Sequence, residues 1–127
     1  MATLIDEARA ARENAVAPFS KFKVGAALRT KGGKIYRGCN VENSTYGLTV
    51  CAERVALLSA LAAGERKFTA IAVVTQSEEP STPCGPCRQL MWEYCGDIEV
   101  TLANLAGQRV EYKLSTLFPY PFTFSVD

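Results

Sequence analysis

The pattern of hydrophobic and polar positions in the first part of the chain predicts a helix followed by a hairpin. The segment 3–16 predicts an amphipathic helix that ends before Pro18, because its apolar residues share one face: Leu4, Ala8, Ala11 and Ala15. Segments 23–30 and 34–39 flank a Lys-Gly-Gly turn and predict the two strands of the hairpin. Polar, turn-forming residues over 40–49 predict a loop, and loops on a rigid scaffold often carry function.

In the rest of the chain the pattern alternates helices with strands. Segment 50–63 is apolar on almost every side, which predicts a buried helix that Gly64 stops. Segment 69–75 is a continuous apolar run, typical of a central strand covered on both faces. The later elements are a helix over 84–95 ended by Gly96, strands over 98–103 and 108–112, and a short helix over 114–118. This order predicts an α/β fold, a three-layer α/β/α sandwich around a mixed five-stranded sheet.

Composition and charge narrow the class of protein. With 127 residues, 48% of them hydrophobic and 21% charged, the chain fits one globular domain spanning 1–127. The N-terminal segment is charged and lacks the apolar region of a signal peptide, and no apolar run is long enough to cross a bilayer. The net charge of +1, without a basic block, argues against nucleic acid or a membrane as a partner. We therefore expect a cytoplasmic protein.

Five cysteines and the absence of histidine point to metal chemistry. In a reducing compartment, cysteines favour metal binding over disulfides. Without an imidazole, chemistry near neutral pH has to rest on a metal or on Glu, Cys or Lys side chains with shifted pKa values.

Three of the cysteines stand at two predicted helix starts, in Cys51-Ala-Glu-Arg and in Pro-Cys84-Gly-Pro-Cys87. Their spacing of three places Cys84 and Cys87 on one helix face, and Cys51 precedes Cys84 by 33 positions. The N-terminus of a helix carries partial positive charge, which stabilises thiolates that reach past its end. Three protein ligands with a fourth position open are typical of a catalytic zinc site, whereas a structural site has four.

Glu53 and Arg54 have predicted roles beside such a zinc ion. Three thiolates carry more negative charge than Zn²⁺ offsets, so a nearby cation is needed. Arg54 is the candidate, because its guanidinium can donate to thiolate sulfur. Glu53 is not needed as a ligand and can instead move the proton of a water that zinc activates.

A lone Cys-x-x-Cys also occurs in redox-active proteins and as half of a structural zinc site. The structural interpretation needs a fourth ligand, which only Cys39 or Cys95 could supply. The second motif, which adds Glu53 at a helix start, favours the catalytic interpretation. Cys39 and Cys95 are then interpreted as buried small hydrophobic residues.

Taken together, these motifs resemble those of the cytidine deaminases, in particular the short, homotetrameric kind whose first zinc ligand is Cys. The resemblance covers nearly the whole chain. Segment 19–27 is similar to the family's first strand, and segment 38–47 is similar to its sugar-binding loop. It implies the cytidine deaminase-like fold and a Zn²⁺ ion bound by Cys51, Cys84 and Cys87.

The resemblance also implies roles for other residues of the site. Glu53 would be the catalytic proton shuttle, and Arg54 would lie behind the zinc ligands. The implied substrate contacts are Phe22 against the pyrimidine, Asn40 and Glu42 on the ribose hydroxyls, Ala52 at the substrate, Ser44 and Tyr46 toward the site of a neighbouring subunit, and Phe122 reaching across from the C-terminus, with Phe124 as the alternative.

The implied reaction converts cytidine or 2′-deoxycytidine to uridine or 2′-deoxyuridine with release of ammonia, a step of pyrimidine salvage. Water activated by zinc attacks C4, while Glu53 protonates N3 and later the leaving ammonia. One alternative is a deaminase of a modified base or a nucleoside antibiotic, of the blasticidin type, but Asn40-x-Glu42 argues against it. The other is a non-catalytic zinc-binding module, which would have no use for Glu53.

Overall fold

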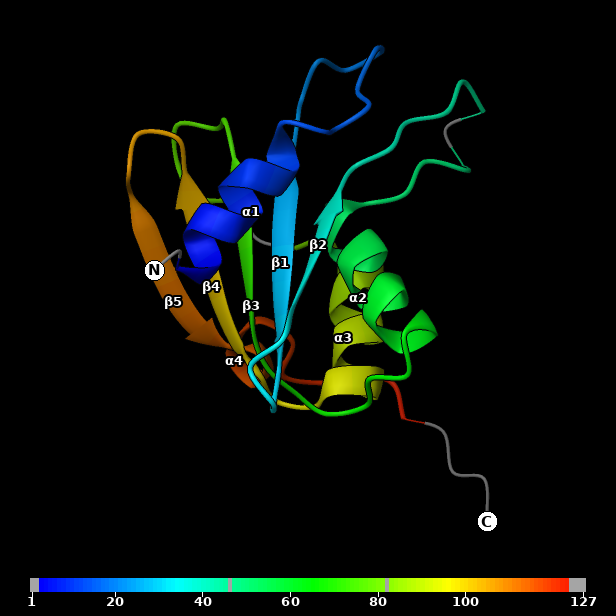
Figure 1. Ribbon diagram of the computed structural model, residues 1–127, viewed down its shortest axis with the longest axis vertical. Coiled ribbons are helices and arrows are strands. Elements are labelled where there is room, and N and C mark those ends of the chain that lie inside the picture. The colour runs from blue at the N-terminus through cyan, green and yellow to red at the C-terminus, as the bar shows by residue number, and fades with distance from the viewer. Residues whose placement is uncertain (1–2, 46, 82, 124–127) are drawn as a thin grey trace.

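The computed structural model describes residues 3–45, 47–81 and 83–123, and it contains one five-stranded sheet with helices on both faces (Figure 1). No helix among these residues has the length and hydropathy that a membrane span requires. In chain order the elements are α1 (Leu4–Arg12), β1 (Gly25–Thr30), β2 (Ile35–Cys39), α2 (Ala52–Ala62), β3 (Phe68–Thr75), α3 (Gly85–Cys95), β4 (Glu99–Asn104), β5 (Arg109–Lys113) and α4 (Leu114–Leu117).

The sheet is mixed, as the sequence predicts. Its strand order is β2-β1-β3-β4-β5, so the apolar strand β3 lies at the centre. Strand β1 pairs antiparallel with β2 and with β3, β3 pairs parallel with β4, and β4 pairs antiparallel with β5. The single parallel pair, β3 and β4, is connected through α3, which brings the start of α3 to the edge of the sheet where β3 ends.

Two hydrophobic cores on opposite faces of the sheet define the three layers. On one face Ala26 and Leu28 of β1 pack with α2 and α3 around Leu57 and Met91. On the other face Ala27, which alternates with them along the strand, packs with residues of α1 and with small residues of β3 and β4. Figure 1 shows α1 in front of the sheet and α2 with α3 on the side of β2 and β1. The three-layer α/β/α prediction is confirmed.

Two glycines in neighbouring strands let helices approach the sheet closely. A Cβ atom at Gly25 of β1 would overlap the carbonyl oxygen of Ala8 and the backbone of Arg12 in α1. A Cβ atom at Gly38 of β2 would overlap the carbonyl oxygen of Ala52 and the backbone of Ala56 in α2. Both helices are therefore seated against the sheet at positions that only glycine permits.

Helix α1 is shorter than the pattern predicts. It begins with a capping box, in which Thr3 and Asp6 exchange side-chain hydrogen bonds with each other's backbone, and it ends at Arg12. The prediction extended this helix to residue 16. Val16 instead leaves it, donates its amide to Asn40 and accepts from Glu42, so pairing with a distant loop replaces the last helical turn.

The expectation that the second helix is buried on every side is wrong. In α2, Ala52, Ala56, Leu57 and Ala60 face the sheet and are buried, while Leu58 is 50% exposed. The helix belongs to an outer layer, so only one of its faces packs against the sheet.

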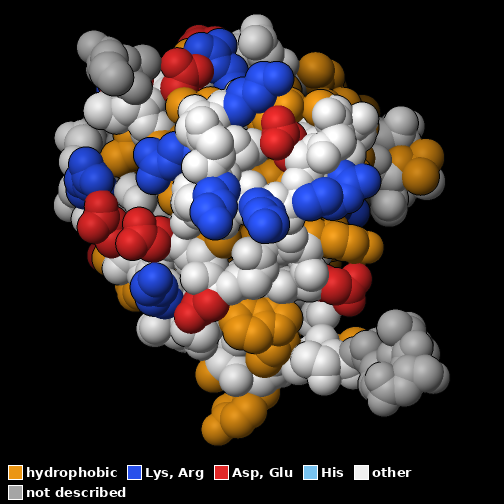
Figure 2. Space-filling view, turned by 60° about the horizontal axis from the view of Figure 1, so that its bottom comes forward, with side chains coloured by type: hydrophobic (Ala, Val, Ile, Leu, Met, Phe, Trp, Pro, Cys, Tyr) orange, Lys and Arg blue, Asp and Glu red, His pale blue; other side chains and the backbone are white. Residues whose placement is uncertain are grey.

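Charges of both signs share the end of the molecule where β1 turns into β2. Figure 2 looks toward this end and shows Lys and Arg side chains in a band, with Asp and Glu side chains between and around them. The mixed arrangement fits the interspersed charges of the sequence.

Candidate active site

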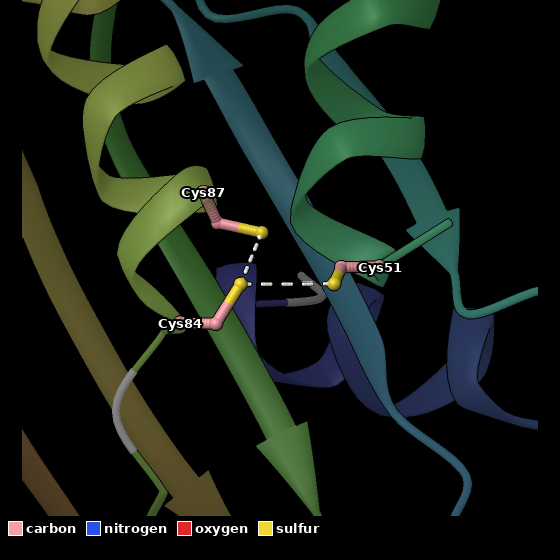
Figure 3. A group of neighbouring side chains, drawn as sticks. All are labelled: Cys51, Cys84 and Cys87. Carbon is pink, nitrogen blue, oxygen red and sulfur yellow. Dashed lines mark hydrogen bonds between the residues drawn. The ribbon is translucent and has the colours of Figure 1, made fainter. Parts of the chain in front are cut away.

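The three cysteines of the two motifs lie together between the starts of α2 and α3 (Figure 3). Cys51 is the N-cap residue of α2 and Cys84 that of α3, and Cys87 lies one turn into α3. Neither N-cap side chain bonds to the backbone of its own helix, so both sulfurs are turned toward the cluster. Helix α2 passes close over β2 at Gly38, and α3 follows the end of β3, so the sheet brings the two helix starts to the same place.

The sulfur geometry fits a zinc ion. The Sγ atoms of Cys51 and Cys84 are 3.8 Å apart, those of Cys84 and Cys87 are 3.2 Å apart, and all three lie within 4.8 Å of one another. Tetrahedral zinc with Zn–S bonds of about 2.3 Å places its sulfur ligands about 3.8 Å apart. These thiols are the only group of three or more His, Cys, Asp or Glu ligands within metal distance among the described residues.

The other two cysteines are not part of this cluster. Cys39 and Cys95 are each partly buried, less than the sequence interpretation expects, and neither belongs to the group of ligands. Cys95 packs against the core around α2 and α3, and burial raises the pKa of its thiol to about 12. The absence of a fourth cysteine at the cluster disfavours a structural zinc site.

Hydrogen bonds and charge around the cluster favour the thiolate form of Cys51. The hydrogen bond with Cys87 is the main cause that lowers the pKa of Cys51 to about 5, and the same bond, with burial, raises the pKa of Cys87. Burial lowers the pKa of Arg54, but its hydrogen bond with Cys87 and the charge on Cys51 raise it by more. Arg54 therefore lies beside the sulfurs, where the sequence places it as the compensating cation.

Glu53 is buried beside the thiols and faces a cavity. Its side chain follows Cys51 by two residues in the first turn of α2, and the residue is only 5% exposed. Burial is the main cause that raises the pKa of this carboxyl group. A carboxyl group in this position can hold and release a proton at an apolar, enclosed site.

The cavity has a volume of about 190 Å³ and a mostly apolar wall. Six of the residues that the sequence predicts for the site line it, which are Phe22, Asn40, Cys51, Ala52, Glu53 and Cys84. Sequence reasoning missed Val24, Thr49, Val50, Val73, Thr75 and Ser81, which also line it. A signal for Val73 and Thr75 exists, since alternate residues near the carboxyl end of the central strand face the same side.

Asn40 lines the cavity, but its side chain is largely engaged with the backbone. Its Oδ1 atom accepts from the Val24 amide at 2.9 Å, and its Nδ2 atom donates to the Phe22 carbonyl at 2.8 Å. The residue is 9% exposed. Asn40 thus holds the segment that carries Phe22, and one N–H of its amide is left for a further acceptor.

Glu42 lies in an adjoining hollow and not in the cavity itself. Its carboxylate accepts from the amides of Phe19 and Ser20 at 3.0 and 3.1 Å and from the Ser20 hydroxyl. The Ser20 hydroxyl bond is the main cause that lowers the pKa of Glu42. Thr49 lines both hollows, so they meet at that residue.

Three residues predicted to serve a neighbouring subunit lie away from this cavity or outside the described residues. Ser44 is exposed on the loop that follows β2. Phe122 is 66% exposed, while its backbone exchanges two hydrogen bonds with the Gln89 side chain, at 2.9 and 3.1 Å. Tyr46 and the alternative Phe124 lie outside the described residues.

Comparison with known proteins places the chain in a family. The family model described as "Cytidine and deoxycytidylate deaminase zinc-binding region" matches residues 1–102. The cytidine deaminase of Halalkalibacterium halodurans is 52% identical over 121 residues, which are 94% of this chain and 92% of that protein. The crystal structure of cytidine deaminase from Burkholderia pseudomallei aligns with a TM-score of 0.91 and 54% identity, covering 94% of this chain and 96% of that one.

An antibiotic-deaminating relative is more distant. The blasticidin-S deaminase of Bacillus cereus is 37% identical over 112 residues, which cover 82% of this chain and 79% of that protein. The family match includes both cysteine motifs and agrees with the three-thiol cluster and with the fold. The chain belongs to the family of zinc-binding cytidine and deoxycytidylate deaminases.

Proposed function

We propose that this enzyme hydrolyses cytidine and 2′-deoxycytidine to uridine and 2′-deoxyuridine with release of ammonia, as a step of pyrimidine salvage. The observation that carries the proposal is the placement of Glu53. Its buried carboxyl group faces a mostly apolar cavity of about 190 Å³ that Cys51 and Cys84 also line. Apolar walls suit a pyrimidine ring, and the carboxyl group suits proton transfer to it.

In this proposal Cys51, Cys84 and Cys87 hold the zinc ion, and Arg54 offsets their negative charge. Zinc, when bound, supplies Lewis acidity that makes a water molecule nucleophilic near neutral pH. Glu53 accepts a proton from the attacking water and delivers it to N3 of the pyrimidine. In the second half of the reaction Glu53 moves the remaining proton of the added water, now the hydroxyl proton on C4, to the amino group, which leaves as ammonia while the C4 carbonyl forms. Apolar walls around Glu53 exclude bulk water from these transfers.

The substrate contacts follow from the cavity and the hollow beside it. Phe22 packs against the pyrimidine, and Ala52 lines the base pocket. The free N–H of Asn40 and the carboxylate of Glu42 bind the ribose hydroxyls where the two hollows meet. A site built to bond a hydroxyl rejects an analogue that lacks it, because its polar groups are then left unpaired. A nucleoside is therefore favoured over the free base.

The experiment measures kcat/KM for cytidine, 2′-deoxycytidine, cytosine and CMP. The rate of ammonia release is the signal. We expect turnover of both nucleosides. Cytosine lacks the sugar and CMP brings a phosphate toward Glu42, so both are expected to be lower by about 10²-fold or more. The control is Glu53→Gln, which keeps the shape of the carboxyl group but cannot shuttle a proton. It is expected to retain zinc and lose at least ~10² in kcat.

Three results would contradict parts of this proposal separately. Equal activity on cytosine and cytidine would remove the sugar-binding assignment of Asn40 and Glu42 and leave the zinc chemistry. Normal turnover by zinc-loaded Glu53→Gln would assign the proton transfers to another group. Turnover of a blasticidin-type antibiotic in preference to all four compounds would favour the alternative substrate class over the proposed one.

We extend the proposal to the assembly and setting of the enzyme. The whole chain, residues 1–127, is one catalytic domain, since a single sheet links all of the described elements. The active species is a homotetramer in which Ser44, Tyr46 and Phe122 complete the site of a neighbour. Support comes from the exposure of Ser44 and of the Phe122 ring, both of which lie outside their own cavity. The thiols must stay reduced to bind zinc, which favours a cytoplasmic location without nucleic acid or membrane partners.

A further inference from the structure

Arg12 is a buried cation that none of the assigned roles uses. It is the last residue of α1 and is 8% exposed. Its Nε atom donates to the Lys23 carbonyl at 3.1 Å, and its Nη2 atom donates to Oε1 of Gln76 at 2.7 Å. Its Nη1 atom lies 3.6 Å from the carboxylate of Glu13, which is exposed. A buried arginine with a forked set of donors is a strong geometric constraint on the groups that it bonds.

The first contact of Arg12 lies in the wall of the cavity. Phe22 and Val24 both line the cavity, and Lys23 is the residue between them. This segment precedes β1 and has no regular secondary structure. Hydrogen bonds to Asn40 and Arg12 hold it instead. The Asn40 side chain bonds the Phe22 carbonyl and the Val24 amide, the Asn40 amide donates to the Val24 carbonyl, and Arg12 bonds the Lys23 carbonyl. Two residues of the wall and the residue between them are thus each bonded by a buried side chain from another part of the fold.

The second contact of Arg12 lies just past the end of β3, the strand next to β1. Gln76 directly follows Thr75, which lines the cavity at the end of β3. The Thr75 hydroxyl lies 2.7 Å from the Ser77 hydroxyl, which lies 2.9 Å from that of Ser81, another residue of the cavity wall. Arg12 therefore joins the Phe22–Val24 wall to the wall formed by the end of β3 and the loop after it.

The position of Arg12 is fixed by the packing of its helix. A Cβ atom at Gly25 would overlap the backbone nitrogen and the Cβ atom of Arg12, so the end of α1 lies directly on β1. A long side chain that starts from a fixed backbone can hold its guanidinium within hydrogen-bond reach of both walls.

We propose that Arg12 is a positioning residue for the base pocket, which sets the distance between the Phe22–Val24 wall and the end of β3. This inference rests on the proposed function, because the pocket is taken to bind a pyrimidine. Arg12 does not reach the cavity itself and acts through the residues that it bonds. It should therefore affect substrate binding more than the proton transfers at Glu53.

The test compares Arg12→Met with Arg9→Met in zinc-loaded enzyme. Methionine keeps the apolar stem of arginine and removes its donors, and Arg9 is an exposed arginine of the same helix. Loss of a hydrogen bond from a charged group predicts a KM for cytidine raised by about tenfold or more, with kcat changed by less than about threefold. Arg9→Met should leave both constants unchanged. Arg12→Lys keeps the positive charge but not the several N–H donors of the guanidinium. Its KM for cytidine should lie between those of Arg12→Met and the wild type.

A double-mutant cycle with Phe22→Ala separates positioning from general stability. If Arg12 acts through Phe22, Arg12→Met should raise KM by less than about twofold in the Phe22→Ala background. Equal effects in both backgrounds, or an unchanged KM in Arg12→Met, would overturn the proposal. If Arg12→Met does not fold, Arg12→Lys and Gln76→Ala carry the same comparison, and an unchanged KM in both would overturn it.

Hydrogen exchange gives a readout that does not depend on the substrate. In Arg12→Met the amides of residues 19–24 should exchange faster, by at least about threefold, while those of β3 keep their protection. Uniformly faster exchange would indicate a structural role only and would overturn the proposal. A wild-type enzyme inactive on all four pyrimidine compounds would refute the proposed function, and the exchange experiment would still decide whether Arg12 holds the wall.

Discussion

At the scale of single residues, the Asn40 and Glu42 side chains, which are proposed to bind the ribose hydroxyls, are already held in place by hydrogen bonds within the chain. Glu42 accepts three hydrogen bonds from Phe19 and Ser20, and Asn40 bonds the backbone on both sides of Lys23. Such groups lose little freedom when a substrate binds, so their interaction with it is less offset by entropy. The same bonds favour the ionised form of Glu42, which can only accept hydrogen bonds.

A first prediction concerns the pH dependence of Glu42. The Ser20 hydroxyl is the main cause that lowers its pKa, so Ser20→Ala should raise the pKa toward the ordinary value of a glutamate. A depressed pKa adds stability above the unfolded pKa, and this contribution is lost as pH falls through the folded pKa. The variant should thus be less stable than the wild type above the unfolded pKa, with a difference that disappears in acid, and its KM should begin to rise at a higher pH as the pH is lowered. NMR titration of the carboxyl carbon, assigned with Glu42→Gln, measures the shift, and an identical pKa in both proteins would contradict it.

The clustering of the three cysteines with Glu53 beside them could be predicted from sequence, while the engagement of Asn40 and Glu42 could not. Cysteine spaced by three at a helix start has few uses, and a neighbouring Glu restricts them further. Asn40, by contrast, is polar and stands in a predicted loop, which fits many roles equally well. Its bonds to Phe22 and Val24 depend on where β1 and β2 pair, which local sequence does not encode.

At the scale of elements, the site is built from two helix starts held at one end of a sheet. The starts of α2 and α3 could be predicted, because Cys51 and Cys84 precede runs with helical character and Pro86 suits a first turn. The end of α1 could not, because Val16 pairs with residues that are distant in sequence. The close approach of α2 to Gly38 could not be predicted either, because it is a contact between segments distant in sequence.

A second prediction tests the close packing of α2 on Gly38 of β2. Gly38→Ala would place a methyl group against the backbone of Ala52 and Ala56, so α2 has to move together with Cys51 and Glu53. Overpacking of this kind costs roughly 1–3 kcal/mol, and we expect a lower Tm, less bound zinc and lower activity. The matched control is Gly85→Ala on α3. A Cβ atom there meets nothing within 4 Å, so zinc content and Tm should be kept or slightly raised. Equal zinc content and Tm in both variants would show that the close packing of α2 on Gly38 is not needed for zinc binding or stability.

At the scale of the whole molecule, a single chain brings only some of the predicted site residues to its cavity. Phe122, which is predicted to contact the substrate, lies outside it. Two of the clustered thiols, Cys51 and Cys84, line one cavity together with Glu53. Phe122, in contrast, is held by its backbone to Gln89 of α3 and exposes most of its ring. An exposed aromatic side chain of this kind has a large apolar area that an interface could bury.

The last prediction is that Phe122 acts on the site of a neighbouring subunit within a homotetramer. Light scattering should give four times the mass of one chain, and Phe122→Ala should raise KM with zinc retained. Subunits carrying Glu53→Gln lack the proton shuttle but keep Phe122. Subunits carrying Phe122→Ala keep Glu53 but lack the aromatic ring. When the two variants are refolded together, mixed assemblies contain sites with both groups, so activity should exceed the sum of the separate proteins. Mixing without subunit exchange is the control. An active monomer, or no recovery in verified mixed assemblies, would mean that each chain closes its own pocket.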